Sequence, residues 1–233
     1  MKIAEYKSYI LGIFRLVTVL SNKNGCEVLH LRNEKAEKDM VLRLSTVPID
    51  AYEKLCGTVC RDLPEVYDVI TLDDGQAVLE EYISGATVAE IMEGGTYKYP
   101  AARSVLRGVL SALDVLHGKN IVHRDVKPEN IIITNDGRVV LIDLNASRTV
   151  KYTGKDTVIM GTVGYASPEQ LGIIETDCRT DIYAAGVLLG VMLTGKHPSE
   201  MLPSGKARKI INKCTSVNPN DRYSSASEMS KAL

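Results

Sequence analysis

The sequence predicts an α+β protein in which a small antiparallel β-sheet is followed by a mostly α-helical part. Three observations lead to this prediction. Short β-rich runs separated by turn residues fill the first third of the 233 residues, helical spacing of apolar residues dominates after Gly85, and the composition changes between Tyr82 and Gly85. We therefore expect one domain with an N-terminal lobe at residues 1–82 and a C-terminal lobe at residues 83–233.

The N-terminal lobe is expected to hold five strands and one helix. The turn-rich residues 21–25 and the charged residues 33–39 separate the first three strands, which indicates an antiparallel meander. The expected strands span residues 16–20, 26–31, 40–44, 66–70 and 77–80, and a short helix is expected near residues 49–59.

Four helices are expected in the C-terminal lobe. Residues 101–119 carry one apolar stripe at three-to-four spacing, formed by Val105, Leu106, Val109, Leu110, Leu113 and Leu116. Residues 181–194 are almost wholly apolar, which is typical of a buried central helix. Residues 206–214 and 224–233 are expected to form the closing helices.

The bulk composition narrows the class of protein. A hydrophobic content of 45% and a charged content of 24% are ordinary for a soluble globular domain. The net charge of −1 gives no overall attraction to nucleic acid or to an anionic membrane, so neither is expected as a partner. The apolar residues 9–20 are interrupted by Arg15 and are too few to span a bilayer, so no membrane segment is expected.

The five cysteines are odd in number and fit no zinc spacing. They favour a cytoplasmic protein with reduced, buried thiols. The alternative is a pairing of Cys56 with Cys60, which would face each other one helical turn apart.

The most informative run is His-Arg-Asp-Val-Lys-Pro-Glu-Asn at residues 123–130. Asp125 can accept a proton from a hydroxyl group, and Lys127, two residues later, can stabilise charge on a transferred phosphate. Asn130 offers an amide oxygen, a ligand that Mg²⁺ accepts. These three residue types at this spacing predict a loop for phosphoryl transfer.

A second metal ligand is expected at Asp143. It ends the apolar run at residues 139–142, and the residues Asn-Asp-Gly at 135–137 supply a hairpin turn before that run. Leu144 is expected to serve as an apolar plug. Asn145 is a residue type that tolerates a positive φ.

Together with residues 161–169, which include Ser167-Pro168-Glu169, these runs resemble the eukaryotic-type protein kinase superfamily, most of all the Ser/Thr kinases of bacteria. The family's catalytic loop reads H-R-D-L-x-x-x-N, and only Val126 differs here. The resemblance covers residues 101–233. It implies a bilobal protein-kinase-like fold that transfers the γ-phosphate of ATP, with Mg²⁺, to serine or threonine of a protein substrate.

The resemblance also assigns individual residues. It makes Asp125 and Lys127 catalytic and gives Asn130 and Asp143 to the metal, and Lys127 favours a Ser/Thr type over a tyrosine type. Two structural roles follow from the resemblance as well. Glu169 would form an ion pair with Arg222, and Asp181 would anchor the backbone of the catalytic loop. The alternative for Asp181 is a simple helix N-cap, which does not exclude the anchor.

The N-terminal lobe departs from the family pattern. The family's phosphate-covering glycines fall at Ser21, Lys23 and Cys26, and the strand lysine that holds the phosphates is Arg43. Glu53 is the candidate helix partner of that cation. Arg43 would either bind the phosphates or lock onto Glu53 and fill the site, or it would face outward.

The adenine base is expected to meet backbone groups of Glu81 and Ile83, with Val28, Val41 and Ile132 as its apolar contacts. Glu80 falls at a position that is usually apolar in the family, where a carboxylate needs a cationic partner or a raised pKa.

Regulation is expected at the loop after residue 148. The resemblance makes Arg124 the receiver of a phosphate on that loop, with Thr153 and Thr157 as candidate acceptors. Thr162 would instead hydrogen-bond the catalytic Asp125 and Lys127.

Two other functions stay open. A pseudokinase, which binds nucleotide or acts as a scaffold with little phosphotransfer, is favoured by Arg43 and the missing glycines. A kinase of small molecules is opposed by the peptide-binding segment at residues 161–169. The sequence predicts neither the oligomeric state nor the identity of the substrate.

Overall fold

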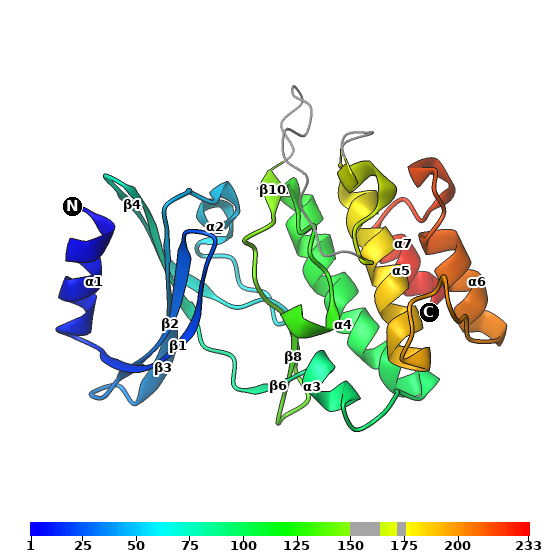
Figure 1. The fold of residues 1–233 in the computed structure, drawn as a ribbon, viewed down its shortest axis with the longest axis horizontal. Helices are drawn as coiled ribbons and strands as arrows, with labels where there is room; N and C mark the ends of the chain where they lie inside the picture. Colours follow the sequence, from blue (N-terminus) through cyan, green and yellow to red (C-terminus); the bar gives the residue numbers. More distant parts are fainter. Residues whose placement is uncertain (150–163, 172–175) are drawn as a thin grey trace. The chain divides into compact units, whose positions relative to one another are not determined.

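The structure is a computed structural model that describes residues 1–149, 164–171 and 176–233 (Figure 1). It divides into two compact units. Unit 1 comprises Met1–Cys60 and Pro64–Ile83, and unit 2 comprises Arg61–Leu63 and Ser84–Leu233. Unit 1 is built mainly of strands and unit 2 mainly of helices, so the predicted α+β composition is confirmed. None of the helices in these described ranges is long and apolar enough to cross a membrane.

Unit 1 contains one antiparallel sheet in the order β1-β2-β3-β5-β4. All five predicted strands are present, and each is longer than expected because the turns between them are short. Their bounds are β1 (Arg15–Lys23), β2 (Cys26–Asn33), β3 (Lys38–Ser45), β4 (Val66–Leu72) and β5 (Gly75–Glu81).

The turn between β1 and β2 corrects the expected five-residue connection. Only Asn24 (φ 53°) and Gly25 (φ 73°) separate the strands, and Lys23 pairs with Cys26. Two successive residues with positive φ form the tight hairpin turn that matches strand twist, and Asn-Gly is its strongest sequence signal. Ser21, Lys23 and Cys26 therefore belong to strands, and no open loop lies at the positions of the family's glycines.

Helix α1 (Ile3–Leu11) was not predicted, and it covers one face of this sheet (Figure 1). Its buried side chains Tyr6 and Ile10 lie three and seven residues after Ile3, which is helical spacing. They pack against Leu29, Leu31, Leu42, Leu44, Leu72 and Ala77. The other helix of unit 1, α2 (Asp50–Leu55), is shorter than the expected residues 49–59.

Within its described residues, unit 2 contains the four predicted α-helices and one short α-helix that was not predicted. The bounds are α3 (Val88–Met92), α4 (Tyr99–Gly118), α5 (Cys178–Thr194), α6 (Gly205–Cys214) and α7 (Ala226–Ala232). Helix α5 contacts α4, α6 and α7, and most of its residues are buried, as expected for the central helix (Figure 1).

Close packing of α5 against α6 depends on Gly186. A Cβ atom at this position would lie 2.3 Å from Cβ of Cys214. Alanine is the better helix former by up to about 1 kcal/mol, but overpacking a core costs about 1–3 kcal/mol. We expect Gly186→Ala to lower the free energy of unfolding by about 1–2 kcal/mol in urea titrations. Gly118→Ala is the control, because a Cβ at Gly118 meets nothing within 4 Å. Equal stability of the two variants would contradict this.

Two small sheets frame the predicted catalytic loop. Strands β6 (Gly85–Thr87), β8 (Ile131–Thr134) and β9 (Val139–Leu141) form one, and β7 (Ile121–Val122) pairs with β10 (Arg148–Thr149) in the other. Gly137, with φ 81°, lies in the turn between β8 and β9, which confirms the predicted hairpin. Residues 123–130 thus run from the end of β7 to the start of β8.

None of the five cysteines, all of which lie in the described residues, forms a disulfide. The pairing of Cys56 with Cys60 is therefore not formed. Only Cys26 and Cys214 are buried, so the expectation of buried thiols is met at two of the positions.

Candidate active site

The three side chains expected to carry the chemistry converge within the loop between β7 and β8. Nζ of Lys127 lies 2.7 Å from Oδ2 of Asp125. Nδ2 of Asn130 donates to the same Oδ2 at 2.8 Å and to the Asp125 carbonyl at 2.9 Å. The 3-10 turn Pro128–Asn130 folds the chain back so that Asn130 reaches Asp125. The side chains of Asp125 and Lys127 are 15% and 19% exposed, so the carboxylate is held in place and still reachable from solvent.

Asp181 on α5 anchors this loop. Its fully buried carboxylate accepts hydrogen bonds from the backbone N–H groups of His123 (2.9 Å) and Arg124 (2.8 Å), and Nε2 of His117 lies 2.8 Å from Oδ2. Burial alone would raise the pKa of Asp181, but the hydrogen bonds and the charge of His117 outweigh it and lower the pKa. The predicted anchor is confirmed. The alternative is wrong, because Asp177 caps the helix by accepting from the Arg179 N–H.

The anchor also supports an unfavourable backbone. Arg124 has φ 67°, a left-handed conformation that costs roughly 1–2 kcal/mol for a residue with a Cβ. Its N–H is held by Asp181, and its carbonyl accepts a hydrogen bond from Nε2 of Gln170 at 2.9 Å. Gln170 and His117 were not singled out in the sequence, because an isolated Gln or His carries no spacing signal.

Asn130 and Asp143 lie at the same end of the β8–β9 hairpin. Ile131 pairs with Leu141, and the Ile142 N–H donates to the Asn130 carbonyl at 2.9 Å. Because Nδ2 of Asn130 is directed to Asp125, its Oδ1 is the atom that a cation would meet. One carboxylate and one amide oxygen suit Mg²⁺, which takes its other ligands from water and phosphate. Across the described residues, no group of three or more His, Cys, Asp or Glu could hold a metal by itself.

The residues after Asp143 correct one expectation. The left-handed backbone occurs at Asp143, with φ 69°, and not at Asn145. The Asn145 N–H lies 3.3 Å from Oδ1 of Asp143, so Asn145 contributes its backbone and not an unusual conformation. Leu144 is buried, as expected for an apolar plug.

Arg43 in unit 1 has a different partner from the expected Glu53. Its Nε lies 2.5 Å from Oε1 of Glu80, and the two residues are 8% and 5% exposed. Glu53 is exposed on α2 and forms no ion pair within the described part of the chain. The helix instead turns Tyr52 inward, whose ring centroid lies 5.9 Å from Cζ of Arg43. Glu80 thus has the cationic partner that its position requires.

Two of the three predicted apolar contacts of the base, Val28 and Val41, lie on the same face of the sheet as Arg43. Val28 and Val41 form a buried cluster with Cys26, against which Tyr82 packs. The ring of Tyr82 stacks on His30 with centroids 3.7 Å apart.

The remaining base-contact residues divide between the two units. The N–H of Glu81 donates to the Glu65 carbonyl at 2.8 Å, so this N–H is already used within the sheet. Ile83 is buried just after β5. Ile132 lies on β8 in unit 2.

The expected regulatory residues are only partly described. Nε of Arg124 donates to the Ala146 carbonyl at 2.9 Å. Burial lowers the pKa of the Arg124 guanidinium, and the nearby positive charge of Arg148 lowers it further. Thr153, Thr157 and Thr162 lie outside the described residues.

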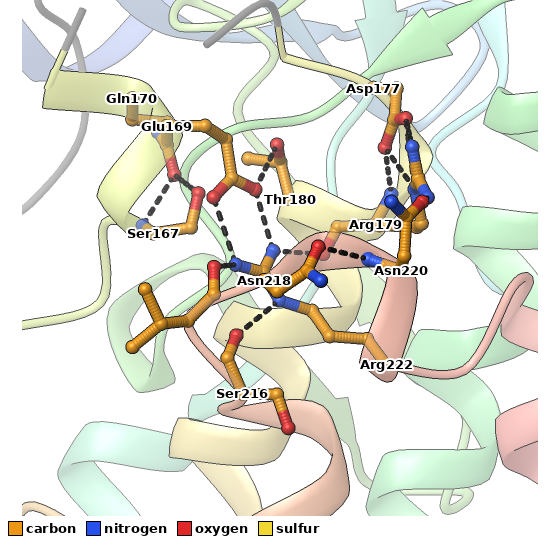
Figure 2. Close-up of polar contacts among 11 residues, drawn as sticks. Ser167, Glu169, Gln170, Asp177, Arg179, Thr180, Ser216, Asn218, Asn220 and Arg222 are labelled. Carbon is orange, nitrogen blue, oxygen red and sulfur yellow. Dashed lines mark hydrogen bonds and ion pairs between the residues drawn. The ribbon is translucent and has the colours of Figure 1, made fainter. Parts of the chain in front are cut away.

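The predicted pair of Glu169 and Arg222 is confirmed, and it is almost fully buried (Figure 2). Arg222 donates from Nη1 and Nη2 to the two carboxylate oxygens at 2.6 Å and 2.9 Å. Its other N–H groups donate to the carbonyls of Ser216, Arg179 and Val217, so all five donors of the guanidinium are used. The pair joins the segment at Ser167 to the connection between α6 and α7. Thr180, at the start of α5, also donates to Glu169.

Because of the Glu169–Arg222 pair, we expect the fold to lose stability at acidic pH. Burial alone would raise the pKa of the Glu169 carboxyl, but the hydrogen bonds and charge of Arg222 hold that pKa below its ordinary value. Because the pKa of Glu169 is lower in the folded state than in the unfolded state, the ionised carboxylate stabilises the fold. This stabilisation is complete when the pH is above the unfolded-state pKa of about 4.3, and it is lost as the pH falls through the lower folded-state pKa. We expect urea titrations to show stability falling below about pH 4, with a smaller slope in Glu169→Gln. Glu200→Gln, which changes an exposed residue, should keep the wild-type slope.

A loop in which Asp, Lys and Asn converge, anchored by a buried Asp on the central helix and followed by a buried Glu–Arg pair, defines a protein kinase domain. A family model described as the protein kinase domain matches residues 59–233, well over half of the chain. The chain therefore belongs to the protein kinase family.

The chain is similar to several bacterial proteins named as serine/threonine kinases. It is 41% identical over 141 residues to serine/threonine-protein kinase PknL of Mycobacterium tuberculosis, covering 59% of this chain and 35% of PknL. It is 39% identical over 139 residues to a probable serine/threonine-protein kinase of Clostridium perfringens (57% and 20%). It is 29% identical over 225 residues to serine/threonine-protein kinase D of Synechocystis (86% and 44%). The chain spans less than half the length of each of these relatives. The resemblance inferred from the sequence is confirmed.

Proposed function

We propose that this domain transfers the γ-phosphate of ATP to serine or threonine hydroxyls of protein substrates. The observation that carries the proposal is that the side chains of Asp125, Lys127 and Asn130 contact one another in a single loop. The backbone of this loop is anchored by hydrogen bonds to the carboxylate of Asp181. Phosphoryl transfer asks a protein mainly for positioning and for charge stabilisation, and this loop is built for both.

Each catalytic residue has a role that its contacts allow. Asp125 orients the substrate hydroxyl and accepts its proton, since its carboxylate is fixed by Asn130 and remains partly exposed. Lys127, at 2.7 Å from that carboxylate, offsets negative charge on the phosphoryl group. This ion pair keeps the ammonium group of Lys127 beside the carboxylate of Asp125.

Asn130 and Asp143 would hold Mg²⁺ through Oδ1 and a carboxylate oxygen. When bound, Mg²⁺ supplies neutralisation of the phosphate charge. The fit rests on the direction of the Asn130 amide, which gives its NH₂ group to Asp125.

In unit 1, Arg43 would bind phosphate, and Val28 and Val41 would contact the base together with backbone groups of Glu81 and Ile83. Ile132 keeps the base-contacting role that the family resemblance implies. The support in unit 1 is that Val28, Val41 and Arg43 share one face of the sheet.

Regulation is proposed at Arg124, which would receive a phosphate on Thr153 or Thr157, while Thr162 would bond Asp125 and Lys127. The nearby Arg148 adds a second positive charge, which supports anion binding there. Five cysteines without a disulfide suit a reducing compartment, and we infer that the domain lies in the cytoplasm.

The test is incubation of the purified domain with γ-labelled ATP, with and without Mg²⁺, followed by phosphoamino-acid analysis of the domain and of a generic protein substrate. We expect Mg²⁺-dependent label on serine or threonine. Thermal unfolding with ATP and Mg²⁺ separates the rival functions. Stabilisation without transfer would indicate a pseudokinase, and label only on small molecules would indicate another class of kinase.

A further inference from the structure

We infer that Glu80 is the positioning residue for Arg43 in nucleotide binding, so that this kinase holds its phosphate-binding cation from within the β-sheet and not from helix α2. The inference deepens the proposed function and rests on it. It assigns a role to a carboxylate that no family motif accounts for, and it removes that role from Glu53.

The guanidinium of Arg43 has more donors than one carboxylate can engage. Nε of Arg43 lies 2.5 Å from Oε1 of Glu80, and a guanidinium carries five N–H donors in a rigid fork. A planar guanidinium can therefore meet a carboxylate along one edge and phosphate oxygens along another. A lysine would have to offer both anions a single ammonium group. We therefore connect the two departures from the family pattern: Arg43 replaces the usual lysine, and Glu80, at a usually apolar position, is the carboxylate that orients it.

The sheet fixes this arrangement. Val41 on β3 pairs with Glu80 on β5, and Arg43, two residues along, pairs with Val78. Arg43 and Glu80 are therefore diagonal neighbours on one face of adjacent strands, where long side chains reach each other. Both are nearly excluded from solvent, so the ion pair is screened little by salt.

Helix α2 contributes an apolar wall in place of a carboxylate. It has six residues, of which Ala51, Tyr52 and Leu55 are buried. Tyr52 is the residue that faces Arg43, at 5.9 Å from ring centroid to Cζ. Since Glu53 points to solvent, movement of its carboxylate cannot release or capture the cation in this arrangement.

The test compares Glu80→Gln with the matched variant Glu53→Gln, using kcat and the KM for ATP measured separately. Arg43 would hold phosphate equally in the ground and transition states, so misplacing it raises KM and leaves kcat nearly unchanged. We expect Glu80→Gln to raise the KM for ATP about tenfold or more, with kcat within about threefold, and Glu53→Gln to change neither by more than about twofold. Glu80→Asp, which keeps the charge, should recover part of the loss.

Three outcomes overturn the inference. An unchanged KM for ATP in Glu80→Gln, with only the apparent kcat lowered, would show loss of folded protein and no positioning of Arg43. A lower KM in Glu80→Gln would show that Glu80 competes with phosphate for Arg43. A large KM effect in Glu53→Gln would return the role to α2.

A second variant guards against misfolding of Glu80→Gln. Replacing both members of a buried ion pair by apolar residues is often neutral for stability, so Arg43→Met/Glu80→Met should fold. We expect its Tm to stay near the wild-type value and its ATP-dependent rise in Tm to be lost. A retained rise would overturn the inference. If the wild-type domain itself shows neither transfer nor an ATP-dependent rise, the proposed function fails and the inference falls with it; if the wild type is active and Glu80→Gln is unaffected, the inference alone fails.

Discussion

Asp125→Asn is expected to lower the rate of phosphotransfer by about 10²–10⁴-fold, the usual contribution of a positioned general base. Asparagine has the shape of aspartate, but its amide cannot accept the proton of the substrate hydroxyl. The substitution also removes the negative charge that holds Lys127 at 2.7 Å. The measurement is kcat with γ-labelled ATP, Mg²⁺ and a protein substrate.

The fold should survive this change, because the loop backbone is held by Asp181 and Gln170 and not by the Asp125 carboxylate. Thermal unfolding should show a Tm close to the wild-type value and a retained rise with ATP. Asp114→Asn provides the matched control on an exposed position of α4 and should leave kcat unchanged. Activity of Asp125→Asn above about a tenth of wild type would exclude the role of base.

Arg222→Met is expected to lower the free energy of unfolding by about 3–5 kcal/mol, the cost of breaking a buried ion pair by removing one partner. Glu169 would be left buried without its counter-charge, and three backbone carbonyls would lose a donor (Figure 2). The measurement is urea unfolding at neutral pH. We expect this loss to exceed that of Gly186→Ala, because an unpaired buried charge costs more than one crowded methyl group.

The chain offers a matched control for that experiment. Arg179 forms an ion pair with Asp177 whose side chains are 30% and 38% exposed, and exposed pairs contribute about 0–1 kcal/mol. Arg179→Met should therefore cost less than about 1 kcal/mol. The double variant Glu169→Leu/Arg222→Met should be more stable than Arg222→Met alone, because no charge remains buried. A loss of similar size in both arginine variants would refute the argument from burial.

The sequence predicted the parts of the site that depend on local spacing. Asp125, Lys127 and Asn130 lie within six residues, so one short loop and one 3-10 turn bring them together. Asp143 follows a hairpin whose turn residues are also local. The pair of Glu169 and Arg222 and the anchor at Asp181 were predicted only because family resemblance supplied the distant partner.

Helix α1 and the Asn24-Gly25 turn both have a signal in the sequence. The helix was nevertheless not predicted, and the turn was expected to be a longer connection. The helix has a short apolar repeat at Ile3, Tyr6 and Ile10, which is weak evidence for a helix by itself. A helix this short is stabilised mainly by packing, here against the leucines of the sheet. The turn carries its own signal, since Asn-Gly favours two successive positive φ values.

The partner of Arg43 could be decided only by the tertiary structure. Glu80 is 37 residues away, and Glu53 is ten. Which carboxylate meets the guanidinium depends on strand register, because a slip of one residue would turn Glu80 to the opposite face of the sheet. The sequence by itself therefore determined the kinase fold and the catalytic loop, which follow from local patterns. The register of β3 on β5 and the inward turn of Tyr52 decided how the phosphate-binding cation is held.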